Sequence, residues 1–112
     1  MKKLIIKRDG IPPISFTGKL IGTSSGYTQT HRRAVITIHR TKGGKFIAVI
    51  SCKTRQYDER YGTEAASFAT AAGVIDWLKQ DNDMLNPLSQ EAVEEAAKVD
   101  PEFAAAWVEE VE

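Results

Sequence analysis

Two residues, Cys52 and His39, have side chains suited to nucleophilic catalysis, a thiol that could attack and an imidazole that could accept its proton. Such a pair needs its reacting atoms within hydrogen-bond reach, roughly 2.6–3.2 Å apart. The strands that carry the two residues decide whether they can meet. Residues 33–39 and 46–52 are both rich in β-branched side chains, and Gly43-Gly44 lies between them. This pattern predicts a β-hairpin.

The hairpin allows two registers. A two-residue loop would put Cys52 and His39 on one face, but about 13 Å apart at ~3.3 Å per residue. A three-residue loop over 42–44, with its last residue left-handed, would put them on opposite faces and pair Ile36 with Ile50. We favour the three-residue loop because it gathers the apolar side chains on one face. Both registers separate the pair, so we expect Cys52 to be a small buried residue and His39 a partly exposed one.

Metal and cofactor chemistry finds little support in the sequence. His31 and His39 are the only histidines and Cys52 is the only cysteine, so no Cys/His zinc cluster can form. Glycine–lysine pairs occur, but none has the Gly-x4-Gly-Lys-Ser/Thr spacing that cradles phosphate. We therefore expect no metal, no cofactor and no small-molecule substrate. An enzyme ranks last among the functional classes.

The zero net charge of the 112-residue chain conceals a strong polarity. Residues 1–60 hold 13 Lys/Arg and 3 Asp/Glu, a net charge of +10, whereas residues 61–112 hold 2 and 12, a net charge of −10. Such asymmetry is typical of nucleic-acid binding or of an acidic tail. The simpler alternative, which we favour, is that a basic sheet and acidic helices neutralise each other within one domain.

Basic and aromatic residues cluster near the ends of the expected strands, where cations could neutralise phosphates and rings could stack on bases. The candidates for binding nucleic acid or another anionic partner are Lys7, Arg8, Arg32, Arg33, Arg40, Lys42, Lys45, Lys53, Arg55, Tyr57 and Tyr61. No known nucleic-acid-binding motif accompanies them. Farther along the chain, Trp77, Phe103 and Trp107 are candidate anchors, either for a partner or for the core.

The elements that position these residues are strands first and helices later. We expect strands at 3–8 and 14–21, a mobile loop at 22–30, and then the central hairpin. The side of that hairpin bearing His39 is not cleanly polar, so we expect another element to cover it. A charged loop at 53–62 precedes a helix at 64–80 capped by Thr63. A short acidic helix begins at Ser89, and Asp100-Pro101-Glu102 starts another.

Together these elements predict an α+β fold: an antiparallel meander of about four strands, one helix packed on it, and two short acidic C-terminal helices. We expect one domain over 1–112, with 1–55 mainly strand and basic and 63–112 mainly helix and acidic. Ile36, Ile50, Phe68 and Ile75 should share one core. The apolar run at 4–6 is too short for a signal-peptide core, and no run spans a membrane, so we expect a cytoplasmic protein.

The sequence favours a small non-catalytic regulator that acts through a surface, on a protein partner or by self-association. The alternative is a nucleic-acid-binding domain whose basic sheet is modulated by the acidic helices.

Overall fold

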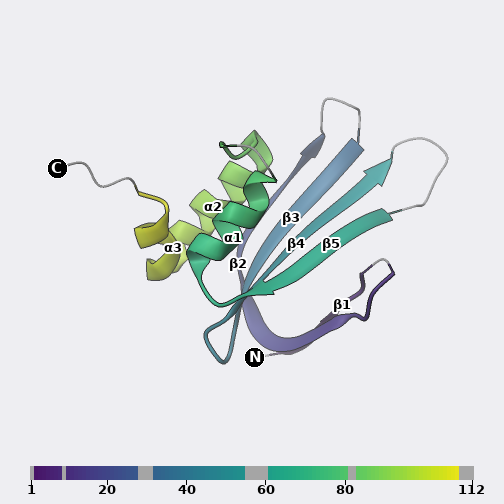
Figure 1. Cartoon of the computed structure of the whole chain (residues 1–112), viewed down its shortest axis with the longest axis horizontal. Coiled ribbons are helices and arrows are strands. Elements are labelled where there is room, and N and C mark those ends of the chain that lie inside the picture. Colours follow the sequence, from purple (N-terminus) through teal and green to yellow (C-terminus); the bar gives the residue numbers. More distant parts are fainter. Residues whose placement is uncertain (1, 9, 28–31, 55–60, 81–82, 109–112) are drawn as a thin grey trace.

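The chain folds into a curled antiparallel sheet with three helices on one of its faces (Figure 1). The computed structural model describes residues 2–8, 10–27, 32–54, 61–80 and 83–108. The strands pair in chain order, and this confirms the predicted α+β meander. They are β1 (Lys2–Ile6), β2 (Ile14–Tyr27), β3 (Arg32–Thr41), β4 (Phe46–Thr54) and β5 (Tyr61–Phe68). The helices are α1 (Ala71–Lys79), α2 (Pro87–Val99) and α3 (Pro101–Ala106).

The β3–β4 hairpin has the three-residue loop that the hydrophobic pattern favours. Ile36 pairs with Ile50, and Thr41 N donates to the carbonyl oxygen of Lys45 at 2.8 Å. Gly44 closes the turn at φ +88°, a conformation that glycine adopts without a steric penalty. The predicted register and the left-handed glycine are both confirmed.

The expected loop at 22–30 is wrong over residues 22–27, which continue β2 beside β3. The small residues there serve the packing of α2. A Cβ on Gly22 would collide with the carbonyl oxygen of Ala92, and Ser24 Oγ donates to the carbonyl oxygen of Leu88 at 2.6 Å. Composition alone suggested a loop because glycine and serine are common in turns, but here they let a helix approach the strand. Residues 28–30 lie outside the described part of the chain.

The predicted helix at 64–80 is also wrong in its first part, because Tyr61–Phe68 forms a fifth strand. Its residues pair with β4 from Phe46–Phe68 to Lys53–Tyr61 without a register shift. Sheet pairing outweighs the modest helix propensity of this alanine-containing segment. The helix begins at Ala71 instead, and Thr70 rather than Thr63 caps it by accepting from Gly73 N at 3.1 Å.

The main core lies between the sheet and the helices. Ile36 and Ile75 are buried in it, and Ile50 and Phe68 pack against it half-buried, so the predicted core quartet is confirmed. Phe68 reaches this core from β5 and not from the helix. Its other buried members include Ile38, Phe46, Ala48, Val74, Leu78, Ala92, Val93, Ala96 and Phe103.

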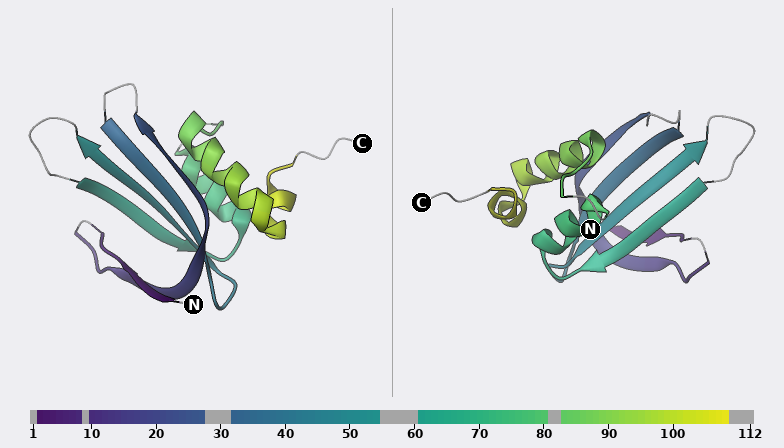
Figure 2. Two further views of the ribbon diagram at one scale, coloured as in Figure 1. Left: turned by 180° about the vertical axis from the view of Figure 1, so that it is seen from behind. Right: turned by 45° about the horizontal axis from the view of Figure 1, so that its top comes forward.

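A second, smaller core covers the opposite face of the sheet. β1 and the first part of β2 curl across that face (Figure 2). Phe16 of β2 packs there with Ile47, Val49 and Ala65, and Leu4, Ile6 and Ile14 surround them. The curl follows an irregularity in the β2–β3 register between Leu20 and Gly22. The expectation that some element covers this face is confirmed.

A polar junction joins β3 to the helices. α2 begins at Pro87, two residues before the expected start, because Asn86 caps it. Asp100 caps α3 as predicted, accepting from the backbone N–H groups of Glu102 and Phe103 at 3.0 and 3.2 Å. Its other oxygen accepts from Arg40 Nη1 at 2.7 Å. Glu102 in turn accepts from the backbone N–H of Ala71 at 2.8 Å, so the junction also reaches α1.

Replacing Asp100 by Ala should lower the free energy of unfolding by about 2–4 kcal/mol, because it removes a helix cap and leaves Arg40 without its main counter-charge. Asp100→Asn should cost less, since asparagine caps a helix about as well and only the ion pair is lost. Urea unfolding of the three proteins measures both effects. Equal stability of the Asn and Ala variants would show that capping contributes nothing here.

Candidate partner-binding groove at the β5 edge

β5 is one edge of the sheet, and its backbone groups alternate between β4 and the open side. In β4, successive residues direct their backbone N–H and C=O groups alternately to β3 and to β5. Lys45 bonds to Thr41 of β3, so Val49, four residues later, also bonds to β3. Ala48 and Ile50 then bond to β5. Their neighbours Ala66 and Glu64 therefore bond β4. Ala65 and Ser67 direct their N–H and C=O groups toward the open side. The carbonyl of Ala65 accordingly accepts a 3.4 Å hydrogen bond from Arg8 Nη1.

The two edges of the sheet differ in how they are protected against further pairing. β1 has five residues, of which Lys2 and Lys3 are charged. β5 has eight residues in regular register, contains no proline or lysine, and carries Glu64 as its one charged residue. Lysines and short length are the usual defences of an edge strand. By these criteria β5 is the edge that can accept another strand.

A groove of about 470 Å³ runs beside this edge. One wall consists of Arg8 and Ile11 from the β1–β2 connection, and the other contains Trp77 of α1. The floor is residues 62–66 of β5. Ile11 is 53% exposed, whereas Trp77 is half-buried with its ring 5.6 Å from that of Phe68. The groove therefore combines an apolar wall on each face of the sheet with a line of backbone polar groups.

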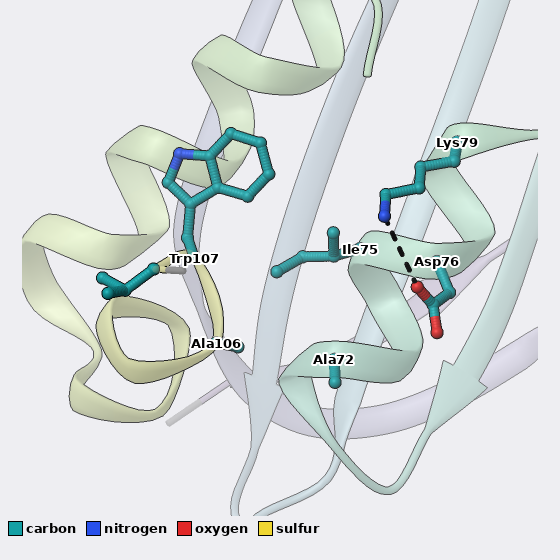
Figure 3. Close-up of a pocket in the computed structure, with 7 residues that line it drawn as sticks. Ala72, Ile75, Asp76, Lys79, Ala106 and Trp107 are labelled. Atoms are coloured by element: carbon teal, nitrogen blue, oxygen red, sulfur yellow. Dashed lines mark ion pairs between the residues drawn. The ribbon is translucent and has the colours of Figure 1, made fainter. Parts of the chain in front are cut away.

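A second hollow of about 400 Å³ lies between α1 and α3 (Figure 3). The ring of Trp107 stands across from Ile75, and an Asp76–Lys79 ion pair of 3.9 Å lies at the far rim. Trp77 points to another side of α1, since successive helix residues are rotated by about 100°. This hollow has helix side chains for walls and no strand edge, so it offers a partner fewer directional bonds.

The three predicted aromatic anchors have different surroundings. Trp77 and Trp107 are half-buried and line the two hollows. Phe103 is fully buried, with its ring edge-on to Phe46 at 5.1 Å, so it anchors the core and is not a partner contact in this structure. Sequence reasoning missed Ile11, Ala65 and the β5 edge. Once residues 61–68 are assigned to a helix, no edge is expected there.

The structure divides the predicted basic residues between the two ends of the sheet. Lys42 and Lys45 lie at the β3–β4 turn, whereas Arg33 lies near the start of β3, roughly 25 Å away at ~3.3 Å per residue. Arg32, Lys53 and Tyr61 are in strands at the end near Arg33, and only their backbone is described. Arg55 and Tyr57 lie outside the described residues. Lys7 is exposed beyond β1.

Two of the predicted basic residues are engaged inside the protein. Arg8 Nε donates to the carbonyl oxygen of Pro12 at 2.8 Å, in addition to its contact with Ala65. Arg40 pairs with Asp100, and its guanidinium lies 5.0 Å from the centre of the Phe46 ring. Arg40 thus has an acidic partner, whereas Arg8 bonds to uncharged backbone carbonyl groups.

Three exposed lysines lie where β1, β2 and the β3–β4 turn meet, and we call them the lysine face: Lys3, Lys19 and Lys42. Leu4 and Phe16 point into the second core, so Lys3 and Lys19 point outward by strand alternation. The backbone N–H of Lys42 donates to the carbonyl oxygen of Thr17, between them, at 2.7 Å. The sequence reasoning omitted Lys3 and Lys19, although the alternation of apolar residues in 3–8 and 14–21 would have placed them together.

Cys52 and His39 lie on opposite faces of the sheet, as the register predicts. Cys52 pairs with Ala34, whereas His39 packs edge-on against Phe16 with ring centres 5.3 Å apart. The Nε2 atom of His39 is 3.3 Å from Thr37 Oγ1, and its Nδ1 has no hydrogen-bond partner within the described part of the chain. Burial lowers the pKa of His39 below the usual 6.5.

No family model, no curated protein and no solved structure matches this chain. Within the described ranges, no three His, Cys, Asp or Glu side chains are grouped to hold a metal ion. None of the helices that the structure describes has the length and apolar character needed to cross a bilayer. The β5 groove and the lysine face are therefore the features on which a function can be based.

Stability should fall as the pH is lowered below 6.5. The unfolded chain binds a proton at His39 more readily than the folded chain, because burial lowers the folded pKa, so acid favours unfolding. The contribution of neutral His39 is complete above pH 6.5 and is lost as the pH falls through the lowered pKa. Thermal melts of wild type and His39→Gln between pH 7.5 and 5.5 measure the difference. Identical pH slopes would contradict this role, since both proteins retain His31.

Proposed function

We propose that the chain is a small non-catalytic binding protein and that another protein docks in its β5 groove. The observation that carries this proposal is the half-buried Trp77 beside a strand edge that contains no lysine or proline. Tryptophan is the side chain most enriched among residues that dominate binding energy. The Phe68 ring supports Trp77, so little side-chain freedom remains to be lost when a partner binds.

The non-catalytic part of the proposal is supported by the positions of the two residues best suited to covalent chemistry. His39 and Cys52 face opposite sides of the sheet. Arg8 and Glu64, the charged side chains of the groove, can select a partner by charge. Their side chains lie on opposite faces of the sheet, an arrangement that suits recognition better than proton transfer between them.

Linear peptides selected from a random displayed library on the wild-type protein should depend on Trp77. We expect Trp77→Ala to weaken their binding about 30-fold, equivalent to about 2 kcal/mol. Trp107→Ala is the matched control and should leave binding unchanged, because Trp107 lines the other hollow. Affinities follow from fluorescence anisotropy, and circular dichroism verifies that both variants fold. Loss of binding in Trp107→Ala with no loss in Trp77→Ala would overturn the assignment of the groove.

A second candidate function, nucleic-acid binding, is favoured by the lysine face. Lys3, Lys19 and Lys42 are exposed, the Lys42 backbone bonds to Thr17 in β2, and a hollow of about 480 Å³ adjoins Lys19 and Lys42. Lysine ammonium groups suit the phosphate backbone, which supplies affinity without reading sequence. Asp100, an acidic side chain that lines that hollow, is already paired with Arg40.

Nucleic-acid binding at this face should show a linear dependence of log affinity on log salt. Replacing Lys3, Lys19 and Lys42 together by Gln should reduce the slope by about three for duplex DNA, at roughly 0.9 per phosphate contact. The control replaces Arg33, Lys79 and Lys98 by Gln, which removes the same charge elsewhere. Titration of a random-sequence duplex at several salt concentrations gives both slopes. Equal effects of the two triple variants would mean that net charge, and not the lysine face, sets the affinity.

A further inference from the structure

We propose that the partner enters the groove as an extended segment and pairs with β5 as a sixth strand of the sheet. This inference rests on the proposed function, because it specifies how a protein occupies the β5 groove. Strand addition draws affinity from main-chain hydrogen bonds and specificity from alternate side chains. Three features of the groove support it: the backbone groups of β5, the walls on both faces of the sheet and the charged side chains.

The floor supplies the first feature. Ala65, on the floor, and Ser67, just beyond it, turn their backbone donors and acceptors away from β4. Glu64 and Ser67 are exposed. Ala65 itself is only 7% exposed because its side chain belongs to the second core and Arg8 reaches its carbonyl. At 3.4 Å that contact is long compared with the usual 2.9–3.0 Å, so a backbone N–H from an incoming strand can replace it. Arg8 thus makes the hydrogen bond to the Ala65 carbonyl that a backbone N–H of a further strand would make.

The walls of the groove supply the second feature. Trp77 forms a wall on the helix face, and Ile11 with Arg8 forms a wall on the face covered by β1 and β2. A strand added at this edge would have one wall against each of its faces. An extended segment needs only the strand edge between these walls, so we take the occupant to be a free extended segment of a different protein.

Charges on the walls supply the third feature. Glu64 pairs with Ile50, so its side chain lies on the helix face near Trp77, where Gln80 Nε2 donates to it at 3.4 Å. Arg8 lies on the opposite wall with Ile11. Residues of an incoming strand alternate between the two faces. The segment should carry an apolar and a basic side chain toward Trp77 and Glu64, and an apolar and an acidic one toward Ile11 and Arg8.

The test uses a peptide selected on the wild-type protein and a series of its backbone N-methylated forms. A strand that pairs along one edge uses the N–H groups of every second residue. Methylation at alternate positions should therefore weaken binding roughly tenfold or more, and the intervening positions should tolerate it. Binding that depends on Trp77 but tolerates methylation at every position would overturn strand addition and leave the proposed function intact. Failure to select any Trp77-dependent peptide would instead overturn the proposed function.

Proline substitutions test the β5 side of the pairing. Ser67→Pro removes an N–H that points to the open side, so the protein should remain folded but bind the peptide more weakly. Ala66→Pro removes a bond to β4 and should lower the melting temperature more. If Ser67→Pro folds and binds like the wild type, β5 does not pair with the peptide. If it fails to fold, the alternate-methylation pattern still decides the matter.

Replacing Arg8 tests whether the peptide displaces the Arg8 side chain from the carbonyl of Ala65. Arg8→Ala should bind a form of the peptide whose acidic residue is replaced by Gln severalfold more tightly, because the competing donor is gone and no charge attraction is lost. Arg33→Ala removes the same charge from an exposed position on β3 and should have no such effect. Tighter binding only in Arg8→Ala supports this displacement. Unchanged or weaker binding in that variant would overturn it.

Discussion

The ion pair between Arg40 and Asp100 connects the basic and the acidic halves of the chain, and the positions of all three helices depend on it. Asp100 is 3% exposed, and a buried carboxylate is costly unless it is paired and hydrogen-bonded. Here it has Arg40 on one oxygen and two backbone N–H groups on the other. The same junction seats Phe103 in the core and lets Glu102 bond the first turn of α1. It thereby orients the helix that presents Trp77.

The curl of the sheet has an equally large effect on the surface. Without it, β1 and β5 would be distant edges of a flat sheet, and the β1–β2 connection would not approach β5. The second core of Phe16, Ile47, Val49 and Ala65 holds the curl in place. Arg8 then spans from the connection to the edge of β5. The groove is therefore a product of two cores, one on each face of the sheet.

Within the described residues, the basic and acidic halves of the chain are joined by ion pairs at one junction. Arg40 meets Asp100 and Glu102 across the main core, whereas the ion pairs of Lys79 and Lys98 lie within single helices. Arg8 is engaged with backbone carbonyls. In the part of the chain that the structure describes, Lys3, Lys19 and Lys42 form no ion pair with an acidic side chain. Mutual neutralisation, the interpretation that the sequence favours, thus describes the Arg40 junction.

The sequence by itself determined the features that depend on local pattern. Alternation and Gly43-Gly44 determined the β3–β4 register, and Asp100-Pro101-Glu102 determined the start of α3, because turn and capping chemistry act over a few residues. Only the tertiary structure decided that 22–27 and 61–68 are strands. Their small residues favour loop or helix locally, and pairing with β3 and β4 overrides that preference. The groove was beyond prediction for the same reason, since it joins Ile11, Ala65 and Trp77 through contacts between distant segments that no local pattern encodes.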